Sequence, residues 1–252
     1  MKTGTLFLDE QAKVTLTRYL HDDSPELANA STRPAILVLP GGGYRVCSDR
    51  EAEPVALAYL AEGFNTFVLR YTVGEAAIFP KPLTDAEKAL ETIFERAEEW
   101  RVDKARVAAI GFSAGGHLAA MLGVSGRVRP RALILGYPCI LESMGSILQH
   151  PVPGAEKAVD AKTPPAFLFV TCEDGLVPVN NSLSFAAALD KAKVPFELHV
   201  FQKGVHGLSL AKPLTSGGVK NLVSPAAARW FGMSVDWLHG LWGDFPADAE
   251  QV

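Results

Sequence analysis

Cysteine is scarce in this sequence, and its few positions exclude two classes of protein. The 252 residues contain three cysteines, Cys47, Cys139 and Cys172. They are far apart and odd in number, so they match neither a disulfide framework nor the paired spacing of a zinc site. A reducing compartment is the simplest setting for such a chain. No H-E-x-x-H run or equivalent cluster is present, so we expect no metal ion and no cofactor.

The sequence also lacks a basic excess, a leader-like segment and a long apolar run. Lys and Arg total 24 against 28 for Asp and Glu, which gives a net charge of −4 and argues against a nucleic-acid partner. The first residues, MKTGTLFLDEQAK, have no apolar core of the kind found in secretory signals. No apolar run approaches the ~18 residues of a membrane span. We therefore expect a cytoplasmic protein without a membrane partner, and leave homo-oligomer formation open.

Apolar runs of strand length recur along the chain and predict a buried sheet. With 48% hydrophobic residues, no internal repeat and no low-complexity linker, residues 1–252 are expected to form a single domain. Most of the runs are continuous rather than alternating, as in parallel strands covered on both faces. The first ~30 residues are expected to add strands at the sheet edge. The predicted inner strands are Pro34–Leu39, Thr66–Arg70, Val107–Gly111, Ala132–Tyr137, Ala166–Thr171 and Pro195–Phe201.

Helix-like segments separate these runs, so the fold class is predicted to be α/β, with a mostly parallel central sheet flanked by helices on both faces. Thr84 and Glu87 have the spacing of a capping box, and so do Ser48 and Glu51. The first box would precede a helix that ends near Trp100. The other predicted helices are Val55–Ala61, Ala114–Leu122, Ser182–Lys191 and an amphipathic segment from Trp230 to Leu241.

The segment GFSAG follows one predicted strand and carries a candidate nucleophile. In an α/β sheet, ligands bind beyond the carboxyl ends of the strands. Ser113 lies at such an end, between Gly111 and Gly115, and small neighbours allow the sharp strand-to-helix turn that exposes a serine hydroxyl. A serine hydroxyl also needs a base, an acid that orients the base, and donors for an oxyanion.

Other strand ends supply these groups. Of the six histidines, His206 is the preferred base, because it follows the last predicted strand in a glycine-flanked loop. Asp174 follows the strand before it and is preferred to its neighbour Glu173 as the acid. The order Ser113, Asp174, His206 is the chain order of hydrolases of this class. The amide of Ala114 and the glycine run after Pro34–Leu39, with Gly42 first and Gly41 second, are the predicted oxyanion donors.

Four segments together resemble a known family. The segments PGGGY, GFSAGGHLA, TPPAFLFVTCEDGLVPVNNS and FQKGVHGLSL are similar to those of the α/β-hydrolase serine esterases. The resemblance points to the bacterial acetyl-xylan/feruloyl esterase-like branch, related to the hormone-sensitive-lipase and prolyl-oligopeptidase-type hydrolases. It implies the nucleophile, acid, base and oxyanion donors named above. Pro40 departs from the broader lipase pattern, in which histidine precedes the glycines, and the stretch from Ile140 to Pro164 is too short for a large lid domain.

The resulting hypothesis is a carboxylic ester hydrolase that removes small acyl groups, acetyl above all, from sugars or xylo-oligosaccharides. The alternative is an arylformamidase of the kynurenine formamidase type. The resemblance also allows it, because such enzymes use a similar glycine loop and a similar strand-to-helix turn around the serine, called the elbow below. A hydrolase fold used only for binding is disfavoured, because every member of the expected triad is present. Four residues near the strand ends are predicted to contact the substrate: Tyr44, Tyr137, His150 and Val177.

Overall fold

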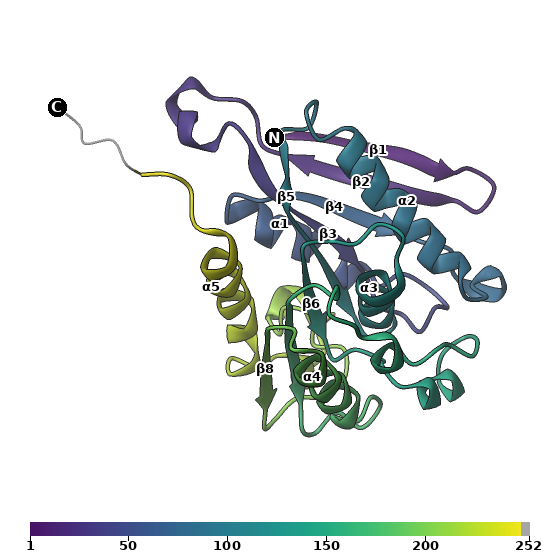
Figure 1. Ribbon diagram of the computed structural model, residues 1–252. Helices are drawn as coiled ribbons and strands as arrows, with labels where there is room; N and C mark the ends of the chain where they lie inside the picture. Colours follow the sequence, from purple (N-terminus) through teal and green to yellow (C-terminus); the bar gives the residue numbers. More distant parts are fainter. Residues whose placement is uncertain (248–252) are drawn as a thin grey trace.

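An eight-stranded sheet forms the centre of the computed structural model, which describes residues 1–247 (Figure 1). The strand order is β1-β2-β4-β3-β5-β6-β7-β8. Strands β3 to β8 run parallel, whereas β2 pairs antiparallel with β4 and β1 antiparallel with β2. The predicted fold class is thereby confirmed. The strands are β1 (Lys2–Asp9), β2 (Val14–Leu20), β3 (Arg33–Leu39), β4 (Asn65–Arg70), β5 (Val102–Phe112), β6 (Ala132–Gly136), β7 (Ala166–Thr171) and β8 (Phe196–Phe201).

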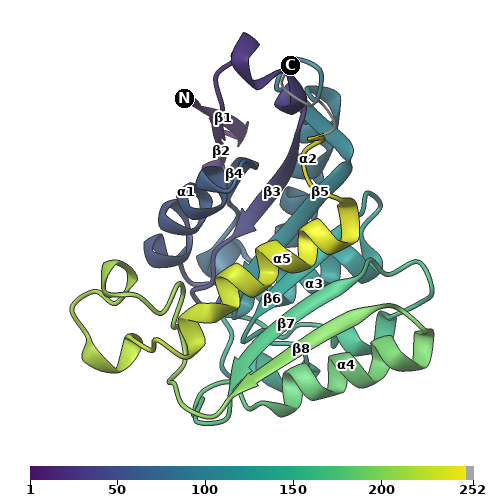
Figure 2. The same ribbon diagram turned by 90° about the vertical axis from the view of Figure 1, so that its left-hand side faces the viewer.

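Helices cover both faces of the sheet and create two apolar cores. One face carries α1 (Glu53–Ala61) and α5 (Trp230–Trp242), and Figure 2 shows α5 lying across the strands. The opposite face carries α2 (Lys81–Glu95), α3 (Ala114–Ser125) and α4 (Asn180–Ala192). Every residue of β3, β6 and β7 is buried, because helices cover each of these strands on both sides. This burial explains why their sequences are continuous apolar runs.

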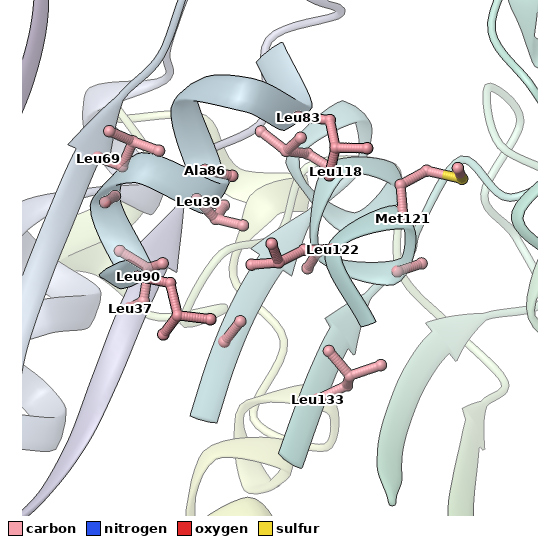
Figure 3. Packing of buried hydrophobic residues seen from close by; sticks show 14 of the residues in the cluster. Leu37, Leu39, Leu69, Leu83, Ala86, Leu90, Leu118, Met121, Leu122 and Leu133 are labelled. Carbon is pink, nitrogen blue, oxygen red and sulfur yellow. The ribbon is translucent and has the colours of Figure 1, made fainter. Parts of the chain in front are cut away.

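The core on the α2 and α3 face packs directly behind the glycine loop and the elbow. Figure 3 shows Leu83 and Leu90 of α2 beside Leu118 and Leu122 of α3, above Leu37 of β3. All five side chains are buried. A fully buried leucine stabilises a fold by about 1.5–3 kcal/mol through removal from water. This packing fixes the start of α3, on which the candidate nucleophile depends.

Two predicted capping boxes are wrong. Thr84 lies inside α2, which begins at Lys81, and its hydroxyl donates to the carbonyl of Pro80. Ser48 makes no side-chain capping bond at the 3-10 turn Asp49–Glu51. In both cases the position of the side chain in the folded protein decides which group it contacts. The capping-box pattern considers only two residues three positions apart and contains no information on that position.

The segment between β6 and β7 is compact. It contains the short 3-10 turns Glu142–Ser146 and Ala155–Ala158, and it forms no large lid, as expected from its length. Residues 1–247 include no helix with the length and apolar character that a bilayer crossing requires.

Candidate active site

Ser113 occupies a sharp turn between β5 and α3. Its backbone lies at φ 53° and ψ −116°, in a region that strains any residue with a Cβ. Two glycines make the turn possible. A Cβ at position 111 would lie 2.0 Å from the carbonyl oxygen of Gly115, and a Cβ at Gly115 would lie 2.1 Å from that of Leu39. The close approach of these backbones therefore requires glycine on both sides of the serine.

Three side chains from distant parts of the chain form one hydrogen-bonded row. Nε2 of His206 lies 2.8 Å from Oγ of Ser113, and Nδ1 lies 2.7 Å from Oδ2 of Asp174. The second carboxylate oxygen of Asp174 accepts the amides of Leu176 and Val177 at 2.9 and 2.8 Å. Those two amides fix the orientation of the carboxylate. Because its Oδ2 can only accept a hydrogen bond, Nδ1 of His206 is the protonated nitrogen, and Nε2 is free to accept the serine proton.

The alternatives for the acid and the base lie elsewhere. Glu173 is exposed, and its carboxylate accepts the amide of Gly204 instead of contacting the imidazole. His117 is buried in α3 between Tyr44 and the carbonyl of Pro153. His199 lies on β8 and contacts Glu197. The structure therefore brings together the three residues that the chain order selected.

The prediction that Gly41 is an oxyanion donor is wrong. Its amide donates to Oε2 of Glu51 at 2.8 Å, in a buried position, and is not available to a substrate. The amides of Gly42 and Gly43 have no acceptor among residues 1–247, and both glycines line the pocket that contains Ser113. Gly42 lies at φ +125°, where a Cβ would lie 2.2 Å from the carbonyl oxygen of Val46, so a side chain is excluded here. The available backbone donors are thus Gly42, Gly43 and Ala114.

Glu51 is the site residue that the sequence did not reveal. Its side chain is buried, with one oxygen on the Gly41 amide and Oε1 2.6 Å from the hydroxyl of Tyr137. Burial raises the pKa of the Glu51 carboxyl, and the two hydrogen bonds oppose that rise. In the sequence, Glu51 is one of several acidic residues in the polar segment SDREAE. A solvent-exposed or helix-capping side chain is the ordinary interpretation of such a residue.

The four residues predicted to contact substrate do not line the pocket that contains Ser113. Tyr44 is buried, with its hydroxyl 2.8 Å from Nδ1 of His117. Tyr137 is buried, with its ring against the His206 imidazole at 5.1 Å between centroids. Val177 is buried beside Asp174, and His150 contacts backbone carbonyls at residues 74 and 75. Both tyrosine rings are buried, and a position directly after a strand does not distinguish a buried ring from an exposed one.

The pocket itself is a cavity of about 290 Å³ above Ser113. Its lining combines apolar side chains with polar and cationic groups. No group of three or more His, Cys, Asp or Glu side chains within residues 1–247 is arranged to hold a metal ion. The lining residues are Gly42, Gly43, Arg45, Ser48, Arg50, Glu51, Ser113, Cys139, Ile147, Leu148, Leu176, His206 and Gly207.

Comparison with known proteins identifies the family. The family model BD-FAE matches residues 24–134, and the model for the prolyl oligopeptidase family matches residues 150–216. A solved structure of MGS-M1, an α/β hydrolase enzyme from a Medee basin deep-sea metagenome library, is 46% identical, covers 96% of this chain and 98% of its own, and superposes with a TM-score of 0.91. The chain belongs to the α/β-hydrolase family. The resemblance drawn from the four segments is thereby confirmed.

Two curated relatives of this α/β hydrolase have names that concern xylan. Endo-1,4-beta-xylanase B of Butyrivibrio fibrisolvens is 36% identical over 78% of the chain, and acetylxylan esterase of Xylanibacter ruminicola is 31% identical over 82%. The hydrolase spans 35% of the first protein and 46% of the second. Its similarity to these relatives therefore concerns less than half of each.

The buried His117 of the hydrolase predicts a loss of stability in acid. Burial lowers the pKa of His117 from 6.5 to about 4, so below pH 6.5 the unfolded chain binds a proton that the folded chain does not. The free energy of unfolding should therefore fall between pH 6.5 and pH 4, by up to about 3 kcal/mol from this group. Urea denaturation at pH 7 and pH 4.5 measures the fall.

The matched variant is His117→Gln, whose amide can accept from Tyr44 and donate to Pro153. It should be less stable than the wild type at pH 7 and lose less stability on acidification. An equal loss of stability in both proteins would show that His117 does not carry the effect.

Proposed function

We propose that this α/β hydrolase is a serine esterase that removes small acyl groups, acetyl above all, from sugars such as xylo-oligosaccharides. Ser113 would be the nucleophile, His206 the base and Asp174 the acid that orients it. The observation that carries the proposal is the unbroken row from Ser113 Oγ through the imidazole to Asp174, which opens into the pocket. The name of the Xylanibacter ruminicola relative supports acetylated xylan fragments as the substrate class.

The mechanism follows from the protonation states in that row. His206 Nε2 accepts the proton of Ser113 as the hydroxyl attacks the ester carbonyl, and the resulting imidazolium is stabilised by Asp174. The developing oxyanion would be bound by the amides of Ala114 and the glycine loop, each worth about 2.7–4 kcal/mol of barrier. The imidazolium then protonates the leaving alcohol. In the second half-reaction the neutral imidazole takes a proton from water as the water attacks the acyl-enzyme, and the imidazolium returns that proton to the Ser113 oxygen as the acid leaves.

The polar part of the pocket lining suits a hydroxyl-rich alcohol. Arg45 and Arg50 belong to this lining, and neither forms an ion pair with any residue of 1–247. Leu148 and Cys139 also line the pocket and are buried, and such apolar side chains suit a short acyl group. The volume of about 290 Å³ lies just below the range of about 300–1,000 Å³ that is typical of small-molecule sites.

We expect p-nitrophenyl acetate to give a burst of one p-nitrophenol per protein, followed by slower steady turnover. Along a series from acetate to octanoate, kcat/KM should fall by at least about tenfold, because overfilling a packed apolar wall costs about 1–3 kcal/mol. Stopped-flow absorbance and initial rates measure both effects.

The same protein should release acetate from acetylated xylo-oligosaccharides and turn over N-formylkynurenine at least about tenfold more slowly. A preference for the formamide, or for octanoate, would contradict the proposed substrate class. Absence of hydrolysis of every ester in the panel would contradict the proposed activity itself.

A further inference from the structure

We infer that Glu51 is a positioning residue, whose buried carboxylate ties the glycine loop after β3 to the loops after β6 and β8 and so presents the Gly42 and Gly43 amides to the reacting carbonyl. This inference rests on the proposed function, because it concerns the donors of the oxyanion site. It gives a role to a buried acidic side chain that the serine, histidine and aspartate do not explain.

The carboxylate has no cation partner within residues 1–247, although its side chain is only 3% exposed. Burial of an unpaired carboxylate is unfavourable, and a neutral group of the same shape is often more stabilising. The neighbouring Arg50 guanidinium donates instead to the carbonyls of Gly207 and Thr215. No ion pair therefore accounts for an acidic residue at position 51.

Hydrogen bonds define what the carboxylate does. The amide of Gly41 can only donate, so it takes Oε2. The Tyr137 hydroxyl accepts the amide of Ser209 at 2.8 Å, which leaves its own proton for Oε1 of Glu51. Both carboxylate oxygens are therefore acceptors. Glu51 connects the loop after β3 directly to Tyr137 after β6, and through the Tyr137 hydroxyl to Ser209 in the loop after β8.

Each of these loops carries a part of the site. The first contains Gly42 and Gly43, whose amides have no acceptor among residues 1–247. The second places the Tyr137 ring against the His206 imidazole, with an interplanar angle of 73°. The third contains His206 itself, and Ser209 Oγ also donates to the carbonyl of Arg50 at 2.5 Å. The bond from the Gly41 amide to Glu51 fixes the start of this loop. In the loop fixed in this way, the Gly42 and Gly43 amides stay free to bind the substrate oxygen.

The test is Glu51→Gln, which keeps the shape and removes the second acceptor. The new amide nitrogen must face either the Gly41 amide, where two donors meet, or the Tyr137 hydroxyl, whose own proton then loses its acceptor. We expect kcat with p-nitrophenyl acetate to fall by about 10–100-fold and KM to change by less than about threefold. The inhibition constant of phenylboronic acid, which forms a tetrahedral adduct on the serine, should rise by the same factor as kcat falls. The thermal midpoint should fall, because one buried donor loses its acceptor, and circular dichroism at the assay temperature shows that the variant is folded.

Glu53→Gln is the matched control, because Glu53 is exposed and only two residues further on. It should retain the wild-type kcat and boronic acid affinity. If Glu51→Gln does not fold, Tyr137→Phe replaces it, since that change removes one bond to the carboxylate and keeps the ring against His206. Its kcat should fall with KM preserved.

A wild-type kcat in Glu51→Gln would overturn the inference, and so would a loss of kcat with unchanged boronic acid affinity. In the fallback, a wild-type kcat in Tyr137→Phe would overturn it. These failures are distinct from failure of the proposed function, in which the wild-type protein itself would hydrolyse no ester.

Discussion

Replacement of Ser113 by alanine is expected to lower kcat for p-nitrophenyl acetate by at least about 10⁴-fold. The variant loses the oxygen that lies 2.8 Å from Nε2 of His206, and no other hydroxyl among residues 1–247 hydrogen-bonds this imidazole. Alanine fits the space, although it keeps the strained backbone at φ 53°. Initial rates on the purified variant, with circular dichroism to confirm folding, measure the effect.

The control for this change is Ser143→Ala, because Ser143 is exposed on the short turn between β6 and β7. A fluorophosphonate probe should label the wild type and Ser143→Ala at position 113 and leave Ser113→Ala unlabelled. Cys139 lies 3.8 Å from the Ser113 hydroxyl, but burial raises its pKa to about 12, so it stays a thiol and does not replace the serine. A folded Ser113→Ala protein with a tenth of the wild-type kcat would contradict the proposed mechanism.

Asp174→Asn should lower kcat by about 10⁴-fold without unfolding the protein. The amides of Leu176 and Val177 both donate to Oδ1, so the asparagine carbonyl will take that position and its NH₂ group will face His206. The imidazole then accepts at Nδ1 and carries its proton on Nε2, opposite Ser113. The base is present in the wrong tautomer.

Glu173→Gln provides the comparison for Asp174→Asn, since it removes the adjacent charge from an exposed side chain. We expect Glu173→Gln to keep at least half of the wild-type kcat. Rates measured from pH 6 to 9 should show Asp174→Asn inactive at neutral pH. Full activity of this variant at pH 7 would exclude the orienting role of Asp174.

Most of the fold could be predicted because burial on both faces leaves a strong pattern in the sequence. β3 and β7 are buried at every residue, and the predicted runs match them to within one residue. β5 is longer than predicted, since its first half, from Val102, contains exposed polar residues that no apolar pattern reveals. Helix starts were less predictable, because the partner of Thr84 depends on the surrounding loops.

The site was predictable where the chemistry requires a residue type at a strand end. Ser113, Asp174 and His206 each follow a parallel strand, and parallel strands bring their carboxyl ends to one edge. The role of Glu51 could not be predicted in this way, because it depends on Gly41 and on two loops more than 80 residues away. The pocket lining was mispredicted for the same reason, because a sequence does not distinguish a ring that lines a cavity from one buried behind it.

The close backbone contacts at Gly111 and Gly115 show which positions of the site cannot accept a substitution. Positions 111 and 115 have carbonyl oxygens where a Cβ would stand, so mutagenesis libraries for new acyl or alcohol preferences should exclude both. Ile147 and Leu176 line the same cavity from segments outside the strands and larger helices, and diversity can be introduced there without disturbing the turn that bears the serine.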